Sequence, residues 1–160
     1  MRVLFWYCEK FAWNPAMKTL DDASDAAAEA HENAVVAFIH VEPKDGENDN
    51  STETKLVKNA KWLARKWETM VIILHSFTHL GEQKAEPESA KALIDRAQRR
   101  LETAGYKAVQ TPYGYFNDLT IQAQGHPLAR IYKEFSGQED RMIDIISKLH
   151  PLLTHVSRNR

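Results

Sequence analysis

Two histidines of this sequence lie at positions where an exposed imidazole could take part in chemistry. His79 follows an apolar run at residues 70–75, and His126 lies between an alternating segment and a segment of helical spacing. Ligands usually bind at the strand ends of α/β sheets. We therefore expect both histidines to end neighbouring strands and to face one pocket, where a neutral imidazole can accept a proton or hold a water molecule.

The Gly125-His126-Pro127 segment also has a structural explanation. A strand that runs into a helix here leaves backbone N–H groups unpaired, and these suit an anionic or polarised group. On chemistry alone, however, an ordinary tight turn is the more frequent role of such a segment.

A metal site is the alternative use of the same histidines. His75 and His79 are four residues apart, with His126 as a candidate third ligand. No helix holds the first two in register, and no Asp or Glu stands directly beside them. We therefore predict no metal and no cofactor, and a metal-dependent hydrolase is the least favoured function. The remaining histidines have contexts typical of surface positions and receive no role: His31, His40, His150 and His155.

An aromatic cluster lies in the loop that precedes the alternating segment. It consists of Tyr113, Tyr115 and Phe116. Burial in the core is the default for such side chains. The functional alternative is a surface on which an adenine base stacks, worth about 1–3 kcal/mol per base.

The elements that must position these residues follow from hydrophobic periodicity. Strands are predicted at 1–8, 34–42, 70–75, 106–110 and 119–124, and helices at 51–67 and 87–104. Three further helices are predicted: one at 22–32, whose apolar face is only alanine, one from Pro127 that stops at Gly137, and a C-terminal tail over 139–157. The order predicts one α/β domain, residues 1–160, with a mixed sheet and packed helices.

Composition limits the classes of function. A chain of 160 residues fits one domain, and a net charge of −1 argues against a protein that coats nucleic acid. The basic face of residues 87–104 is interpreted as a solvated helix surface. The single Cys8 excludes an internal disulfide, and residues 3–8 are too short for a signal or a membrane span. We expect a cytoplasmic protein without membrane contact.

Four segments together resemble a known family. MRVL at 1–4, FIHVE at 38–42, SFTHL at 76–80 and the PYGYF…GHPLA run at 112–129 are similar to the N-terminal editing domain of archaeal-type threonyl-tRNA synthetases. The resemblance covers nearly the whole chain and weakens in residues 9–32 and after Phe135. It implies a D-aminoacyl-tRNA deacylase-like fold, a homodimer, and hydrolysis of serine wrongly attached to tRNA(Thr) at the 3′-terminal adenosine, with the ribose 2′-hydroxyl assisting.

The resemblance also implies roles for individual residues. His79 is a site residue, and Thr78 lies beside the adenosine. Phe116 stands where tyrosine is common, Asn117 where the editing enzymes have lysine, and Arg130 where they have glutamate. The first change removes a cation that could stabilise an oxyanion, and the last puts a permanent cation in place of a carboxylate. The candidate catalytic residues are His79, Asn117 and Arg130, and the candidate substrate-binding residues are Thr78, Tyr115, Phe116 and His126.

Two functions of different class follow. The first is a freestanding aminoacyl-tRNA deacylase, which lacks a synthetase catalytic core and acts on the tRNA 3′ end with a threonyl-tRNA synthetase in trans. The second is an inactive relative that binds a nucleotide, an aminoacyl-adenosine or a tRNA end. The charge changes at Asn117 and Arg130 motivate the second.

Overall fold

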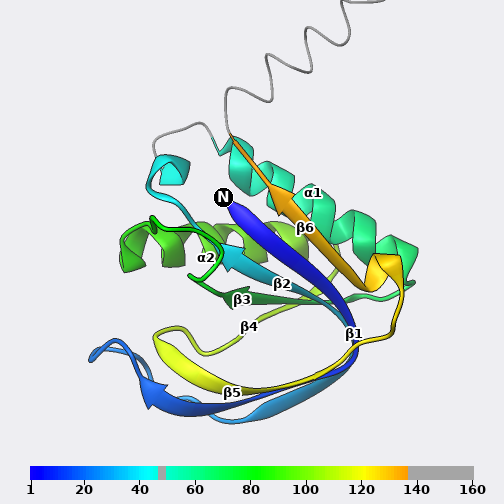
Figure 1. The fold of residues 1–160 in the computed structure, drawn as a ribbon, viewed down its shortest axis with the longest axis horizontal. Coiled ribbons are helices and arrows are strands. Elements are labelled where there is room, and N and C mark those ends of the chain that lie inside the picture. The colour runs from blue at the N-terminus through cyan, green and yellow to red at the C-terminus, as the bar shows by residue number, and fades with distance from the viewer. Residues whose placement is uncertain (47–49, 137–160) are drawn as a thin grey trace, which may run out of the picture.

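A long first strand, β1 (Arg2–Lys18), organises the sheet. In the computed structural model, which describes residues 1–46 and 50–136, β1 pairs antiparallel with β2 (Glu29–His40) along one edge. Its other edge is shared by β6 (Arg130–Glu134) and β5 (Tyr115–Gln122). β1 curves strongly, so that β5 lies far below the helices while β6 lies beside them (Figure 1). A register shift between Pro15 and Met17 marks a bulge near its end.

The other half of the sheet is parallel. β2 pairs with β3 (Val71–Ser76), and β3 pairs with β4 (Lys107–Gln110), which gives the order β4-β3-β2-β1-β5. Helices α1 (Ser51–Lys66) and α2 (Pro87–Thr103) lie on one face of the sheet (Figure 1), and short 3₁₀ turns occur at η1 (Pro43–Gly46) and η2 (Pro127–Ala129). The predicted α/β class with a mixed sheet is confirmed.

Both faces of the sheet are packed, which explains the near-continuous apolar runs in the sequence. On the helix face, Val35, Ala37 and Ile39 of β2 join the apolar stripes of α1 and α2 in one core. On the opposite face, Val36 and Phe38 alternate with them and form a second, more aromatic cluster. The carboxyl end of β3 lies between these two layers.

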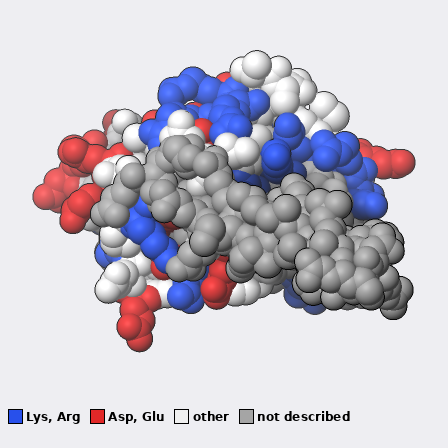
Figure 2. All heavy atoms as spheres, turned by 90° about the horizontal axis from the view of Figure 1, so that it is seen from above, with Lys and Arg blue, Asp and Glu red and all other residues white. Residues whose placement is uncertain are grey.

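The arginines of α2 hold the two helices together. Glu53 of α1 is 3% exposed, and its carboxylate accepts hydrogen bonds from Arg96 Nε at 2.7 Å and Arg100 Nη1 at 2.9 Å. Figure 2 shows Lys and Arg on the face seen from above in several groups. Through their hydrogen bonds to Glu53, Arg96 and Arg100 join α2 to α1.

None of the described helices is long and apolar enough to cross a membrane.

Two predicted helices are wrong. Residues 22–28 contain no helix, and residues 29–32 open β2, where Glu29 to Glu32 pair with β1. The alanine-only face of this segment could not anchor a helix. The segment after Pro127 forms η2 and then β6, which pairs with Arg2–Trp6. The helical stop at Gly137 and the tail at 139–157 lie outside the described residues.

Candidate functional site

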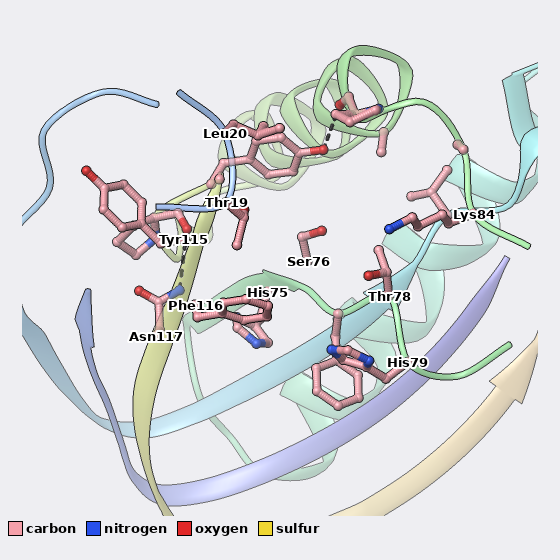
Figure 3. A pocket seen from close by; sticks show the side chains of 18 of the residues that line it. Thr19, Leu20, His75, Ser76, Thr78, His79, Lys84, Tyr115, Phe116 and Asn117 are labelled. Carbon is pink, nitrogen blue, oxygen red and sulfur yellow. Dashed lines mark hydrogen bonds between the residues drawn. The ribbon is translucent and has the colours of Figure 1, made fainter. Parts of the chain in front are cut away.

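A cavity opens at the carboxyl end of β3. Its volume is about 370 Å³, within the range of small-ligand sites. Most of its lining comes from the end of β3 with the loop that follows, the β4–β5 connection with the first half of β5, and the segment after β1 (Figure 3). Val41 and the start of α2 complete it. This is the position that an α/β sheet typically offers to a ligand.

The cavity brings together five of the seven predicted site residues. They line it from two sides and are Thr78, His79, Tyr115, Phe116 and Asn117. His126 and Arg130 do not line it. The prediction that His126 faces the same pocket as His79 is therefore wrong.

His126 has a structural role: its side chain caps the turn that it begins. Its Nδ1 accepts a hydrogen bond from the Leu128 backbone N–H at 3.0 Å, which caps η2. Its ring lies edge-on to Trp67, with centroids 5.2 Å apart, and the Trp67 indole N–H donates to the Leu128 carbonyl at 3.0 Å. We expected this backbone N–H to be free for an anion, but it donates a hydrogen bond to the side chain of His126 instead.

Arg130 lies at the start of β6, opposite Trp6 of β1. Its guanidinium carbon lies 5.6 Å from the centroid of the Trp6 ring, and its Nη2 donates to the Gln124 carbonyl at 3.2 Å. Both contacts are structural. The side chain is therefore engaged away from the cavity, and no geometry here links it to Asn117 or His79.

His79 is the exposed imidazole of the cavity. Its ring lies edge-on to Phe77, with centroids 4.9 Å apart and planes at 71°. Within residues 1–46 and 50–136 neither ring nitrogen has a hydrogen-bond partner. Packing against Phe77 orients the ring, while both nitrogens stay available to a ligand or water.

His75 is a wall of the cavity. It is 6% exposed, and its Nδ1 is 2.8 Å from Thr111 Oγ1. Burial among aromatic rings lowers the pKa of His75 to about 4, so the ring is neutral at pH 7. No group of three or more His, Cys, Asp and Glu could hold a metal within the described parts of the chain.

The loop that carries His79 is anchored by a histidine that we had placed at the surface. His40 is 0% exposed, which contradicts that prediction. Its Nδ1 accepts from the Leu80 N–H at 3.1 Å, and its Nε2 is 2.7 Å from the Gln83 carbonyl, to which it donates. Arg2 Nη1 donates to the Leu80 carbonyl at 3.1 Å. One buried imidazole thus fixes both sides of the loop, a role of His40 that no sequence pattern indicated.

The opposite wall depends on Gly114. Its φ of +81° favours glycine, and a Cβ there would lie 3.0 Å from Ala23 Cβ. The Gly114 carbonyl accepts from the Thr19 N–H at 2.7 Å, and the Tyr115 hydroxyl donates to the Ser24 carbonyl at 2.9 Å. These contacts hold the segment after β1 against the β4–β5 connection, which closes the cavity on that side.

Phe116 and Asn117 form the rim beside this wall. The Phe116 side chain is 57% exposed, as a stacking surface must be. Asn117 Nδ2 lies 3.4 Å from the Pro112 carbonyl, while its Oδ1 is buried without a partner among the described residues. A buried amide oxygen without a partner is costly, and a bound hydroxyl or ammonium would satisfy it.

The buried His75 predicts a pH dependence of stability. Its pKa is about 4 in the folded protein against an ordinary 6.5, so the unfolded chain binds more protons between these values. Lowering the pH from 6.5 to 4 should therefore cost roughly 3 kcal/mol of unfolding free energy through this group. Urea titrations of wild type and His75→Gln should differ by this amount in their acid-dependent loss. Equal losses in the two proteins would contradict the prediction.

Comparison with solved structures defines the fold class. The chain superposes on a probable eukaryotic D-amino acid tRNA deacylase with a TM-score of 0.52 and 12% identity, over 84% of this chain and 98% of that one. It superposes on a c-Myc DNA unwinding element binding protein with a TM-score of 0.61 and 12% identity, over 86% and 100%. The fold is that of the D-aminoacyl-tRNA deacylases.

Sequence comparison then shows the family. Residues 1–135 match the archaea-specific editing domain of threonyl-tRNA synthetase, and the chain belongs to this family. It is 24% identical to a threonine–tRNA ligase of Hyperthermus butylicus over 95% of this chain and 25% of that protein, and 28% identical to one of Pyrobaculum calidifontis over 92% and 24%. The chain thus spans about a quarter of the length of these relatives.

Proposed function

We propose that this chain is an aminoacyl-tRNA deacylase, which hydrolyses the ester of seryl-tRNA(Thr) at the 3′-terminal adenosine. Membership of the editing-domain family supports an editing function. The observation that carries the proposal is one cavity that gathers Thr78, His79, Tyr115, Phe116 and Asn117. We place the reaction in the cytoplasm and propose a homodimer that works beside a threonyl-tRNA synthetase in trans.

The cavity suits ester hydrolysis without a carboxylate base. In the part of the chain that the structure describes, no Asp or Glu lines it. His75 is held by Thr111, and its lowered pKa of about 4 makes it a poor proton acceptor. The exposed imidazole of His79 and the ribose 2′-hydroxyl of the substrate remain as the groups that can activate water.

The lining residues have distinct roles in the proposed reaction. The adenine stacks on Phe116, and Thr78 lies beside the ribose. A water molecule, oriented by His79 or by the 2′-hydroxyl, attacks the ester carbonyl carbon. The bond between that carbon and O3′ breaks, the proton from water ends on O3′, and free serine and intact tRNA leave. The Asn117 side-chain NH₂ is a neutral hydrogen-bond donor, and its role is to stabilise the oxyanion that forms on the carbonyl oxygen.

The test is deacylation of 3′-labelled Ser-tRNA(Thr) compared with Thr-tRNA(Thr). We expect the serine ester to be released faster, because a pocket that closes on a serine side chain must exclude the additional methyl group of threonine. One methyl group gives roughly 10- to 200-fold discrimination in such pockets. Release of both esters at the rate of the protein-free reaction would contradict the proposal.

The second candidate is a binding module without turnover. It is favoured by Asn117, which lines the cavity at the position where the resemblance implies lysine. A module of this kind would bind adenosine or a tRNA end and leave every aminoacyl ester intact. Saturable binding of adenosine together with no release of any amino acid would select it over the deacylase.

A further inference from the structure

One cation lines the cavity, and no predicted role accounts for it. Lys84 contributes to the wall opposite Phe116 and Asn117, on the side of Thr78 (Figure 3). Among the lining residues within 1–46 and 50–136, it is the only Lys or Arg, and none of them is an Asp or Glu. Whatever anionic group enters this cavity meets its positive charge at Lys84.

The backbone on both sides of Lys84 is fixed. The Gln83 carbonyl is 2.7 Å from Nε2 of the buried His40, and the Ala85 N–H donates to the Val41 carbonyl at 2.9 Å. In the part of the chain that the structure describes, the Lys84 ammonium has no hydrogen bond or ion pair of its own. The fold thus fixes the backbone of Lys84 at the cavity wall, while its ammonium group stays available to a ligand.

We propose that Lys84 binds the phosphate of the tRNA's 3′-terminal nucleotide. This inference rests on the proposed function, since it takes the occupant to be an adenosine stacked on Phe116. An adenine at the Phe116 rim and a ribose beside Thr78 place the attached phosphate toward the Lys84 side of the cavity (Figure 3). An ammonium on a flexible stem suits a phosphate as a point charge.

The assignment predicts that the cavity binds a nucleotide more tightly than a nucleoside. Glu82 and Glu86 flank Lys84 in sequence but do not line the cavity. Because Lys84 is exposed to solvent, its contact with phosphate adds modest affinity and is screened by salt. Its effect should therefore be on binding of the charged ligand and not on binding of the base.

The experiment compares 5′-AMP with adenosine by heteronuclear NMR titration at low salt. Wild type should bind AMP on the order of fivefold more tightly than adenosine. Lys84→Met should remove that preference while adenosine binds as before, and Lys84→Arg should keep it. Lys58→Met is the matched control, because Lys58 lies on the exposed side of α1, outside the cavity. The wild-type preference should shrink as salt is added.

The outcomes separate this inference from the proposed function. Equal affinity of wild type for AMP and adenosine, or an AMP preference that survives in Lys84→Met, would overturn the role of Lys84 and leave the adenosine site standing. Failure of both ligands to bind would remove the nucleotide site and the inference with it. A loss of preference in Lys58→Met equal to that in Lys84→Met would assign the effect to net charge and overturn the proposal.

Discussion

Replacing His79 by alanine is expected to lower the rate of Ser-tRNA(Thr) deacylation by about 10²- to 10⁴-fold, the usual contribution of a positioned proton acceptor. His79 is the exposed imidazole of the cavity, since His75 is buried against Thr111 and His126 lies outside. The loss should fall on kcat, because the adenine surface at Phe116 is untouched. Single-turnover deacylation with labelled seryl-tRNA would measure it.

The matched control is His126→Ala. It removes an imidazole that caps η2 and packs on Trp67, so it should lower the melting temperature slightly and change the rate less than about twofold. The unfolding midpoint of His79→Ala should stay close to that of wild type, because the side chain is exposed. A large rate loss in His126→Ala with none in His79→Ala would place the chemistry at the Gly-His-Pro turn and contradict the assignment to His79.

The mistaken helix after Pro127 shows where periodicity fails. Ile131 and Phe135 are four residues apart, which fits one face of a helix and also one face of a strand. The choice was made by a partner distant in sequence: β6 pairs with Arg2–Trp6, and the Phe135 N–H donates to the Met1 carbonyl at 2.8 Å. Such pairing cannot be derived from a window of local sequence.

The strands and helices that were predicted correctly carry stronger local signals. Residues 87–104 combine proline at the start, an apolar stripe and a glycine after the end, and α2 spans Pro87–Thr103. Residues 70–75 are a near-continuous apolar run that ends in His75, and β3 is buried between two parallel neighbours. In both segments local propensity and tertiary packing favour the same structure.

The cavity residues also divide into those that the sequence indicated and those that it did not. The resemblance selected Thr78, His79, Phe116, Asn117 and Arg130, and all of them except Arg130 line the cavity. It gave no signal for His40 or Lys84. A histidine at the end of an apolar strand and a lysine in a polar loop are each common, and their roles arise only because the loop folds back over β2. Roles of that kind require the three-dimensional structure.

Reversing the two charge changes in the family pattern should have unequal effects on the deacylation rate. Asn117→Lys is expected to raise the deacylation rate by about tenfold or more, because a cation at the cavity rim can stabilise the oxyanion where a neutral amide now stands. Arg130→Glu is expected to change the rate less than about twofold, since Arg130 is engaged with Trp6 and Gln124 outside the cavity.

Asn117→Met separates charge from size, because methionine lengthens the side chain without a cation. A gain confined to Asn117→Lys would show that a missing charge limits the reaction. An increase in Arg130→Glu without one in Asn117→Lys would mean that a carboxylate at position 130 reaches the substrate. That result would contradict the cavity as the site of chemistry, because Arg130 does not line it. The two substitutions therefore test the placement of the active site more sharply than either does alone.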